Sequence, residues 1–282
     1  TKGQKVHVLE IMETWTKVRT EDGFAGYVEG EYSSNPFDSC YAIADSVISN
    51  GNNAGGFIGY NDGASAINCY AIVNDYILGS MSAGGFYGFY DGFYSYSEED
   101  DDESKATTTY CYSKFNKVLS SGSYAGGFIG GFENYYETAI DNCYAIGNSV
   151  IASDTYVGGF TGNTRETKIT NCYASVDELS AGNTSKLGSF AGMITDTIVS
   201  SCFSTNNENP FIAELDLAQY INSYILENGY IAEPSDSSMD FSGWGEKPWS
   251  TTIWHLDSTE IPNLPTLRDD IYYDPGIVVV SL

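Results

Sequence analysis

The sequence is poor in histidine, in positive charge and in long apolar runs. It holds two His in 282 residues, and 12 Lys+Arg stand against 38 Asp+Glu, which gives a net charge of −26. Two histidines leave little material for acid–base catalysis at neutral pH. The charge argues against nucleic acid or an anionic membrane surface as a partner, because both are polyanions. No run approaches about 18 consecutive apolar residues, so we expect no membrane insertion by this chain.

An internal repeat organises most of the sequence. Six cysteines open a common phrase, which reads NCYAIGNSVI in its fourth copy. Fifteen residues after each of the first four cysteines comes a glycine pair inside a phrase such as AGGFIG, and the fifth copy has Gly-Ser at sixteen. The unit is thus about 29 residues long, and its length varies after the glycine phrase. The six cysteines are Cys40, Cys69, Cys111, Cys143, Cys172 and Cys202.

The unit is typical of short strands separated by sharp corners. Cys-Tyr-Ala-Ile alternates small and large side chains, which is the period of a strand with two different faces. A β-branched pair such as Val150-Ile151 follows, and then an apolar run framed by glycines. Three short strands per unit fit one coil of a β-solenoid, whose units bury their apolar faces by stacking. We therefore predict an all-β, β-helix-like solenoid of about five to six coils.

Two flanks fall outside the repeat. Residues 1–32 alternate like short strands and contain one Trp, whereas residues 206–267 hold the other three Trp and five of the seven Pro. Solenoid ends expose strand edges and apolar faces that something must cover. We therefore predict an N-terminal β-barrel segment over 1–32, a solenoid over 38–205, an aromatic cap over 206–267 and a tail over 268–282.

The repeat phrase resembles the GLUG repeat of bacterial surface and secreted proteins. Asn-Cys-Tyr-Ala is followed after about fifteen residues by Ala-Gly-Gly-Phe-Ile-Gly, with Phe where that family usually has Leu. The segment from Phe241 to Pro265 is similar to the one that commonly closes such arrays. GLUG repeats also occur beside the catalytic domain of IgA-specific metallopeptidases. The Phe positions are Phe57, Phe86, Phe128, Phe160 and Phe190.

The N-terminal segment resembles the second half of a bacterial SH3-like (SH3b) domain. Lys2-Gly3, Trp15, Asp22-Gly23 and Gly26-Tyr27-Val28 match the pattern of that family, whose first strands are absent here. Together the resemblances imply an extracellular or cell-surface location in a bacterium, with adhesion or ligand binding as the role. A surface glycan, a cell-wall component or a host protein would be the partner. Neither resemblance implies a catalytic residue in this chain.

The cysteines and the aromatic residues that follow them predict two columns along the rod. One cysteine per coil at constant phase stacks into a ladder of small packed side chains, whose parallel directions are poorly aimed for disulfides. Some disulfides remain the alternative, and the C-x-x-C spacing of a zinc site is missing. The next residues would stack on the opposite strand face, either as a binding column or beneath a covering segment. They are Tyr41, Tyr70, Tyr112, Tyr144, Tyr173 and Phe203.

The enlarged segment over residues 88–109 is the most distinctive departure from the repeat. An aromatic run that begins just before this segment supplies the candidate ligand-binding residues Tyr87, Phe89, Tyr90, Phe93, Tyr94 and Tyr96. The acidic run over 98–103 suggests Ca²⁺ through Glu98, Asp100 and Asp102, because oxygen-rich, charge-dense ligands suit that ion. Consecutive carboxylates do not reproduce the D-x-D-x-D-G spacing, so we expect a solvated loop without a cofactor, with Ca²⁺ binding as the alternative.

Enzymatic activity is not expected. The sequence has no H-E-x-x-H, G-x-S-x-G, P-loop or G-x-G-x-x-G, and His7 and His255 lie in opposite flanks. We predict a non-catalytic adhesion or ligand-binding module built on a rigid repeat rod. A passive spacer or wall-associated stalk is the first alternative. A carbohydrate-active enzyme that uses two carboxylates on a β-helix is the second.

Overall fold

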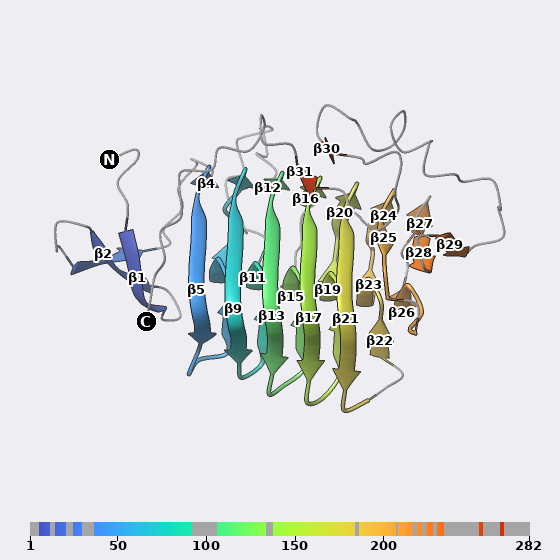
Figure 1. Ribbon diagram of the computed structural model, residues 1–282, viewed down its shortest axis with the longest axis horizontal. Coiled ribbons are helices and arrows are strands. Elements are labelled where there is room, and N and C mark those ends of the chain that lie inside the picture. The colour runs from blue at the N-terminus through green and yellow to red at the C-terminus, as the bar shows by residue number, and fades with distance from the viewer. Residues whose placement is uncertain are drawn as a thin grey trace, which may run out of the picture.

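The fold is a rod of stacked coils, in which parallel strands of successive coils lie side by side (Figure 1). The computed structural model describes residues 6–11, 15–20, 25–29, 37–91, 106–133, 138–183, 186–206, 208–216, 219–221, 224–227, 230–233, 254–255 and 266–267. The elements in these ranges are β-strands, as the sequence predicts. No helix in the described part is long and apolar enough to cross a membrane.

Each coil contributes one strand to each of four parallel sheets. We number these sheets I to IV in chain order, starting from the strand that follows the cysteine. Sheet I holds the long strands that begin after each cysteine and run side by side in Figure 1. They are β5 (Tyr41–Ile48), β9 (Tyr70–Gly79), β13 (Tyr112–Ser120), β17 (Tyr144–Ala152), β21 (Tyr173–Ala181), β25 (Phe203–Ser204) and β28 (Tyr224–Glu227), followed by β29 (Tyr230–Glu233), which is antiparallel to β28.

Sheets II and III flank the glycine phrase. Sheet II comprises β6 (Asn53–Gly55), β10 (Ser82–Gly84), β14 (Tyr124–Gly126), β18 (Tyr156–Gly158) and β22 (Leu187–Gly188). Sheet III comprises β7 (Ile58–Asp62), β11 (Tyr87–Asp91), β15 (Ile129–Glu133), β19 (Thr161–Arg165), β23 (Ala191–Thr195) and β26 (Ile212–Asp216).

Sheet IV consists of strands that the sequence did not predict. It precedes each cysteine and comprises β4 (Phe37–Asp38), β8 (Ala66–Ile67), β12 (Thr107–Thr109), β16 (Thr138–Asp141), β20 (Thr167–Thr170), β24 (Ile198–Ser200) and β27 (Gln219–Ile221). A full coil therefore has four strands instead of the predicted three. Strands of two to four residues are too short to show an alternating pattern.

The described strands also extend the rod past residue 205. β26, β27 and β28 pair in parallel with the preceding strands of sheets III, IV and I, so the coil pattern continues into the segment predicted as a cap. Elsewhere, β1 (Val6–Ile11), β2 (Trp15–Thr20) and β3 (Ala25–Glu29) form an antiparallel sheet in the segment predicted as a barrel remnant. Near the other end of the chain, β30 (Trp254–His255) pairs with β31 (Thr266–Leu267).

The core consists of columns of like residues, one per coil. Phe86, Phe128, Phe160 and Phe190 are fully buried, and successive rings stack with centroids 4.8–4.9 Å apart. This spacing is the distance between neighbouring strands of a sheet, so exact register brings equivalent rings into contact. Each coil thus buries its apolar side chains against the coils before and after it.

Two kinds of corner keep the coils in register. The residue before each cysteine has a φ between 52° and 57°, which is the left-handed region that Asn tolerates better than most residues. At the corner between sheets II and III, the chain passes so close to itself that a Cβ on Gly84 would lie 1.8 Å from the carbonyl oxygen of Tyr87. Only glycine fits there. The left-handed residues are Ser39, Asn68, Tyr110, Asn142, Asn171 and Ser201.

Candidate functional site

The aromatic residues predicted to bind a ligand divide between the core and the surface. Tyr87 and Tyr90 are fully buried inside strand β11, where their rings meet edge to face with centroids 5.4 Å apart. The Tyr87 hydroxyl lies 3.2 Å from the Thr108 Oγ1 across the coil. Burial raises the pKa of Tyr87 well above its ordinary value. These two residues therefore pack the core and cannot reach a ligand at the surface, which corrects the prediction for them.

Phe89 points the other way and does lie at the surface. It stands between Tyr87 and Tyr90 on the same strand, and its ring stacks on Tyr60 of β7 with centroids 5.9 Å apart and 5° between the planes. Tyr60 is 40% exposed. The remaining predicted residues, namely Phe93, Tyr94, Tyr96, Glu98, Asp100 and Asp102, lie outside the described residues.

A row of carboxylates runs beside these rings. Asp91 pairs in register with Asp62 on one side and with Glu133 on the other, so three acidic side chains occupy equivalent positions on successive coils. The Tyr60 hydroxyl donates to the Asp91 Oδ2 at 2.5 Å. We call Tyr60, Asp62, Phe89, Asp91 and Glu133 the ring–carboxylate face.

Burial and the closeness of the carboxylates shift two pKa values on this face. Partial burial and the neighbouring Asp91 charge both raise the pKa of Asp62. Burial and then the hydrogen bond to Asp91 raise the pKa of Tyr60 as well, so its hydroxyl stays a donor at neutral pH.

The Phe89 ring covers the equivalent position of the next coil. The residue in register there is Gly131, and a Cβ on it would lie 2.8 Å from the Phe89 Cδ2. The Phe89 ring therefore leans over a position without a side chain. Further along the same column stand Asn163 and Met193, so the exposed aromatic pair is confined to the first two coils of the described rod.

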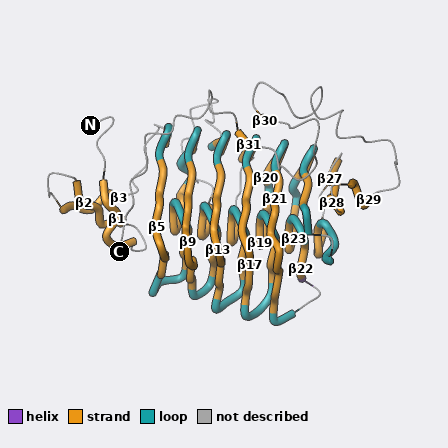
Figure 2. Tube along the Cα trace, viewed as in Figure 1, coloured by secondary structure: helices purple, strands orange, loops and turns teal. Residues whose placement is uncertain are grey.

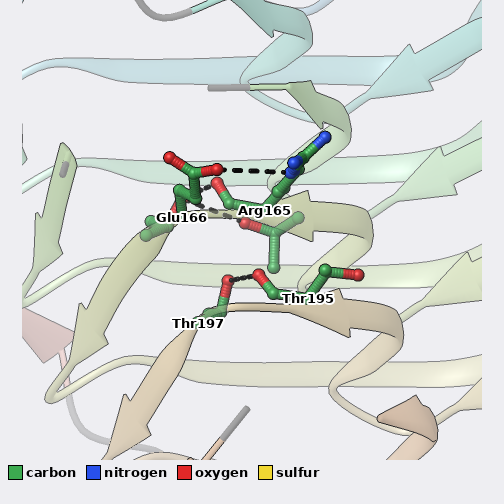
Figure 3. Close-up of polar contacts among 6 residues, drawn as sticks. Arg165, Glu166, Thr195 and Thr197 are labelled. Atoms are coloured by element: carbon green, nitrogen blue, oxygen red, sulfur yellow. Dashed lines mark hydrogen bonds and ion pairs between the residues drawn. The ribbon is translucent and has the colours of Figure 1, made fainter. Parts of the chain in front are cut away.

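The corner that follows the ring–carboxylate face is where coils differ in length. In two later coils it is a tight turn centred on Glu166 and Asp196, with φ values of 50° and 45° (Figure 3). The Thr197 hydroxyl closes one turn by donating to the Thr195 carbonyl at 2.8 Å, and the Glu166 N–H donates to that carbonyl at 3.1 Å. In the second coil the same corner expands into residues 92–105, which lie outside the described residues. The tube in Figure 2 shows how loops gather at the ends of the strands.

The cysteines form a column of free thiols. Cys69, Cys111, Cys143, Cys172 and Cys202 are buried, whereas Cys40 at the first coil is partly exposed. The N–H groups of Cys40, Cys69, Cys143 and Cys172 each donate to the sulfur of the next cysteine along the rod at 3.4 Å. Within the described ranges no group of three or more His, Cys, Asp or Glu could hold a metal ion.

The aromatic residues after the cysteines stack as a second column. Successive rings from Tyr41 to Phe203 have centroids 4.8–5.1 Å apart. Tyr70, Tyr144, Tyr173 and Phe203 are buried, with at most 4% of each residue exposed. The expected column is therefore present, but most of it is covered and offers no open binding face.

Comparisons with known proteins give one structural likeness. No family model matches the chain, and no curated protein matches it. A crystal structure from Bacteroides ovatus, described as a "putative immunoglobulin A1 protease", aligns with a TM-score of 0.48 and 19% identity. The alignment covers 83% of this chain and 74% of that one.

Tyr60 is the surface residue that the sequence analysis did not single out. Its signal was present, because Gly59-Tyr60 occupies the same phase after the glycine phrase as Gly88-Phe89. Aligning the units beyond the glycine phrase would have found both the ring pair and the row of Asp62, Asp91 and Glu133.

Proposed function

We propose that this chain is a non-catalytic binding module in which a rigid rod presents the ring–carboxylate face to a neutral surface glycan. The observation that carries the proposal is the exposed Tyr60 ring, stacked on Phe89 and flanked by carboxylates of two coils. A ring supplies an apolar surface for the C–H groups of a sugar, and carboxylate oxygens accept hydrogen bonds from its hydroxyls. Few convergent polar groups beside an apolar surface are typical of ligand sites.

The charge of the chain selects the class of glycan. At a net charge of −26, the chain repels anionic polymers over several ångströms. Asp62 and Asp91 would add direct repulsion at the site itself. A neutral polysaccharide suffers neither cost, so it is the glycan class that we propose.

In this proposal the rod holds the binding groups at fixed positions. Its four sheets pair coil to coil in register, so the surface groups of successive coils keep fixed spacings of about 4.8 Å. Fixed spacing lets individually weak contacts to a repeating polymer act together. The resemblance of the sequence to GLUG repeats and to a partial SH3b domain supports an extracellular or cell-surface setting in a bacterium for this activity.

A glycan array probed with the purified chain tests the proposal. We expect specific binding to neutral glycans that is lost in Tyr60→Ala and kept in Met193→Ala, a matched outward substitution in the same column four coils away. Circular dichroism of each variant checks that the fold is intact.

Other outcomes would assign the chain differently. Binding that survives Tyr60→Ala but disappears on deletion of residues 98–103, or on removal of Ca²⁺, would move the site to the enlarged loop. Absence of binding to any glycan or matrix protein would favour a passive spacer. Glycan cleavage products detected by mass spectrometry would contradict a non-catalytic role.

A further inference from the structure

A stripe of aliphatic side chains lies on the outer face of sheet I, near the C-terminal ends of the long strands. Ile48, Leu78, Leu119 and Ile151 are in register on β5, β9, β13 and β17. Their neighbours Val47, Ile77, Val118 and Val150 are buried, so strand alternation directs the stripe outward. Ile48 is 53% exposed, and the other three are partly exposed.

The order of residue types in the stripe is the same in both directions along the rod. Its order is Ile, Leu, Leu, Ile, and the next position, Ser180 on β21, is polar. A surface of this symmetry can meet an identical surface turned end for end, which is the requirement for an isologous dimer. The two-fold axis would run along the strands, between β9 and β13, and would place Leu78 of one copy against Leu119 of the other.

The charges beside the stripe have the matching symmetry. Asp75 is exposed on β9, and Lys117 is exposed on β13 at nearly the same height along the strand, opposite Tyr76. The axis that exchanges Leu78 with Leu119 also exchanges these two strands. It therefore brings Lys117 of each copy to Asp75 of the other, where a parallel arrangement of the rods would not.

We propose that two copies of this chain associate as antiparallel rods through the Ile48–Leu78–Leu119–Ile151 stripe, with Lys117 of each copy paired to Asp75 of the other. The inference is independent of the proposed glycan site, because the stripe lies on sheet I and the ring–carboxylate face lies on sheet III. The dimer would carry one ring–carboxylate face on each rod, both within the four coils over which the rods overlap.

Sedimentation velocity of the full chain across the micromolar range tests this association. Measured at physiological ionic strength, where the screening length is about 8 Å, the net charge of each copy is largely screened. We expect a dimer, and we expect Leu119→Asp to raise its dissociation constant at least about tenfold. Ser180→Asp, one coil beyond the stripe in the same column, should leave the constant unchanged.

Charge reversal tests the antiparallel register itself. Lys117→Glu and Asp75→Lys should each weaken the dimer, and the double variant should restore it, because both charge pairs of the symmetric interface are then rebuilt with opposite sign. A wild-type chain that stays monomeric at every concentration would overturn the proposal. A dimer that survives Leu119→Asp, or a double variant without restoration, would overturn it equally.

Discussion

Tyr60 and Asp91 lie on neighbouring coils and are joined by a hydrogen bond of 2.5 Å from the phenol hydroxyl to the carboxylate. The bond crosses 31 positions of sequence but only one strand spacing, because β7 and β11 pair in parallel register. It fixes the exposed ring beside the acidic row, and it distinguishes this part of the rod from later coils, where Asn163 and Met193 take the place of the rings.

Removal of the surface ring should abolish binding at little cost in stability, whereas removal of a core ring should cost much stability. Tyr60→Ala should change the free energy of unfolding by less than about 1 kcal/mol while abolishing glycan binding. Tyr87→Ala should cost about 3–5 kcal/mol, because it leaves a large cavity where the ring is fully buried. Urea unfolding followed by circular dichroism measures both. Equal destabilisation by the two variants would contradict the assignment of Tyr60 to the surface.

The crowded carboxylates predict a pH dependence of stability. The folded pKa of Asp62 lies above its ordinary value of 3.8, so between the two pKa values the folded chain binds more protons than the unfolded chain. Stability therefore falls as the pH rises through that window, and the full cost is present at neutral pH. Asp62→Asn should add about 0.2–1 kcal/mol at pH 7, the size of a cross-strand charge effect.

Urea unfolding at two pH values checks this sign. At about pH 3, below the unfolded pKa, the gain from Asp62→Asn should vanish because both states are protonated. Asp177→Asn, an exposed carboxylate on sheet I, serves as the control and should change stability by less than about 0.5 kcal/mol. A loss of stability in Asp62→Asn at pH 7 would show that the carboxylate charge is favourable there.

Two glycines of the same coil should respond very differently to alanine. A Cβ on Gly126 would lie 1.8 Å from the Ile129 carbonyl oxygen, which is backbone and cannot move aside, so Gly126→Ala should cost about 3 kcal/mol or more. At Gly131 the nearest atom belongs to the Phe89 ring, which can rotate away, so Gly131→Ala should cost about 1 kcal/mol. Thermal unfolding of the two variants compares them directly.

Thiol reactivity should separate the first coil from the others. The thiols of Cys69, Cys111, Cys143, Cys172 and Cys202 are buried, whereas Cys40 is partly exposed, and reaction with a disulfide reagent needs an accessible thiol. In the native chain we expect only Cys40 to react measurably, and all six to react in urea. Ellman titration with mass mapping checks this. Absence of free thiols under denaturing, non-reducing conditions would instead show the disulfides that the sequence left open.

The repeat made the solenoid predictable, because register follows from the cysteine and glycine phrases. What the sequence could not show was the fourth strand of each coil. Ala66–Ile67 and Phe37–Asp38 are defined by pairing with their neighbours, since two residues carry no period of their own. The parallel direction and the register of those strands come from the stack as a whole.

The candidate site was only partly accessible to sequence reasoning. Tyr87 and Tyr90 were assigned to a loop because the aromatic run looks continuous, whereas strand β11 lasts to Asp91 and directs these two inward. In β11 the inward and outward alternation of side chains is interrupted at Gly88, which has no partner in the pairing of β11 with β15. That irregularity puts Tyr87 and Tyr90, three positions apart, on the same side.

Constant register also fixes the distances between surface groups along the rod. Every surface group is separated from its equivalents by whole multiples of one strand spacing, about 4.8 Å. Loss or duplication of a single 29-residue coil would change the distance between two surface features by one strand spacing. The cross-section of the rod and its corners would stay unchanged. Evolution or engineering can therefore adjust the reach of this molecule in discrete steps without redesigning its core.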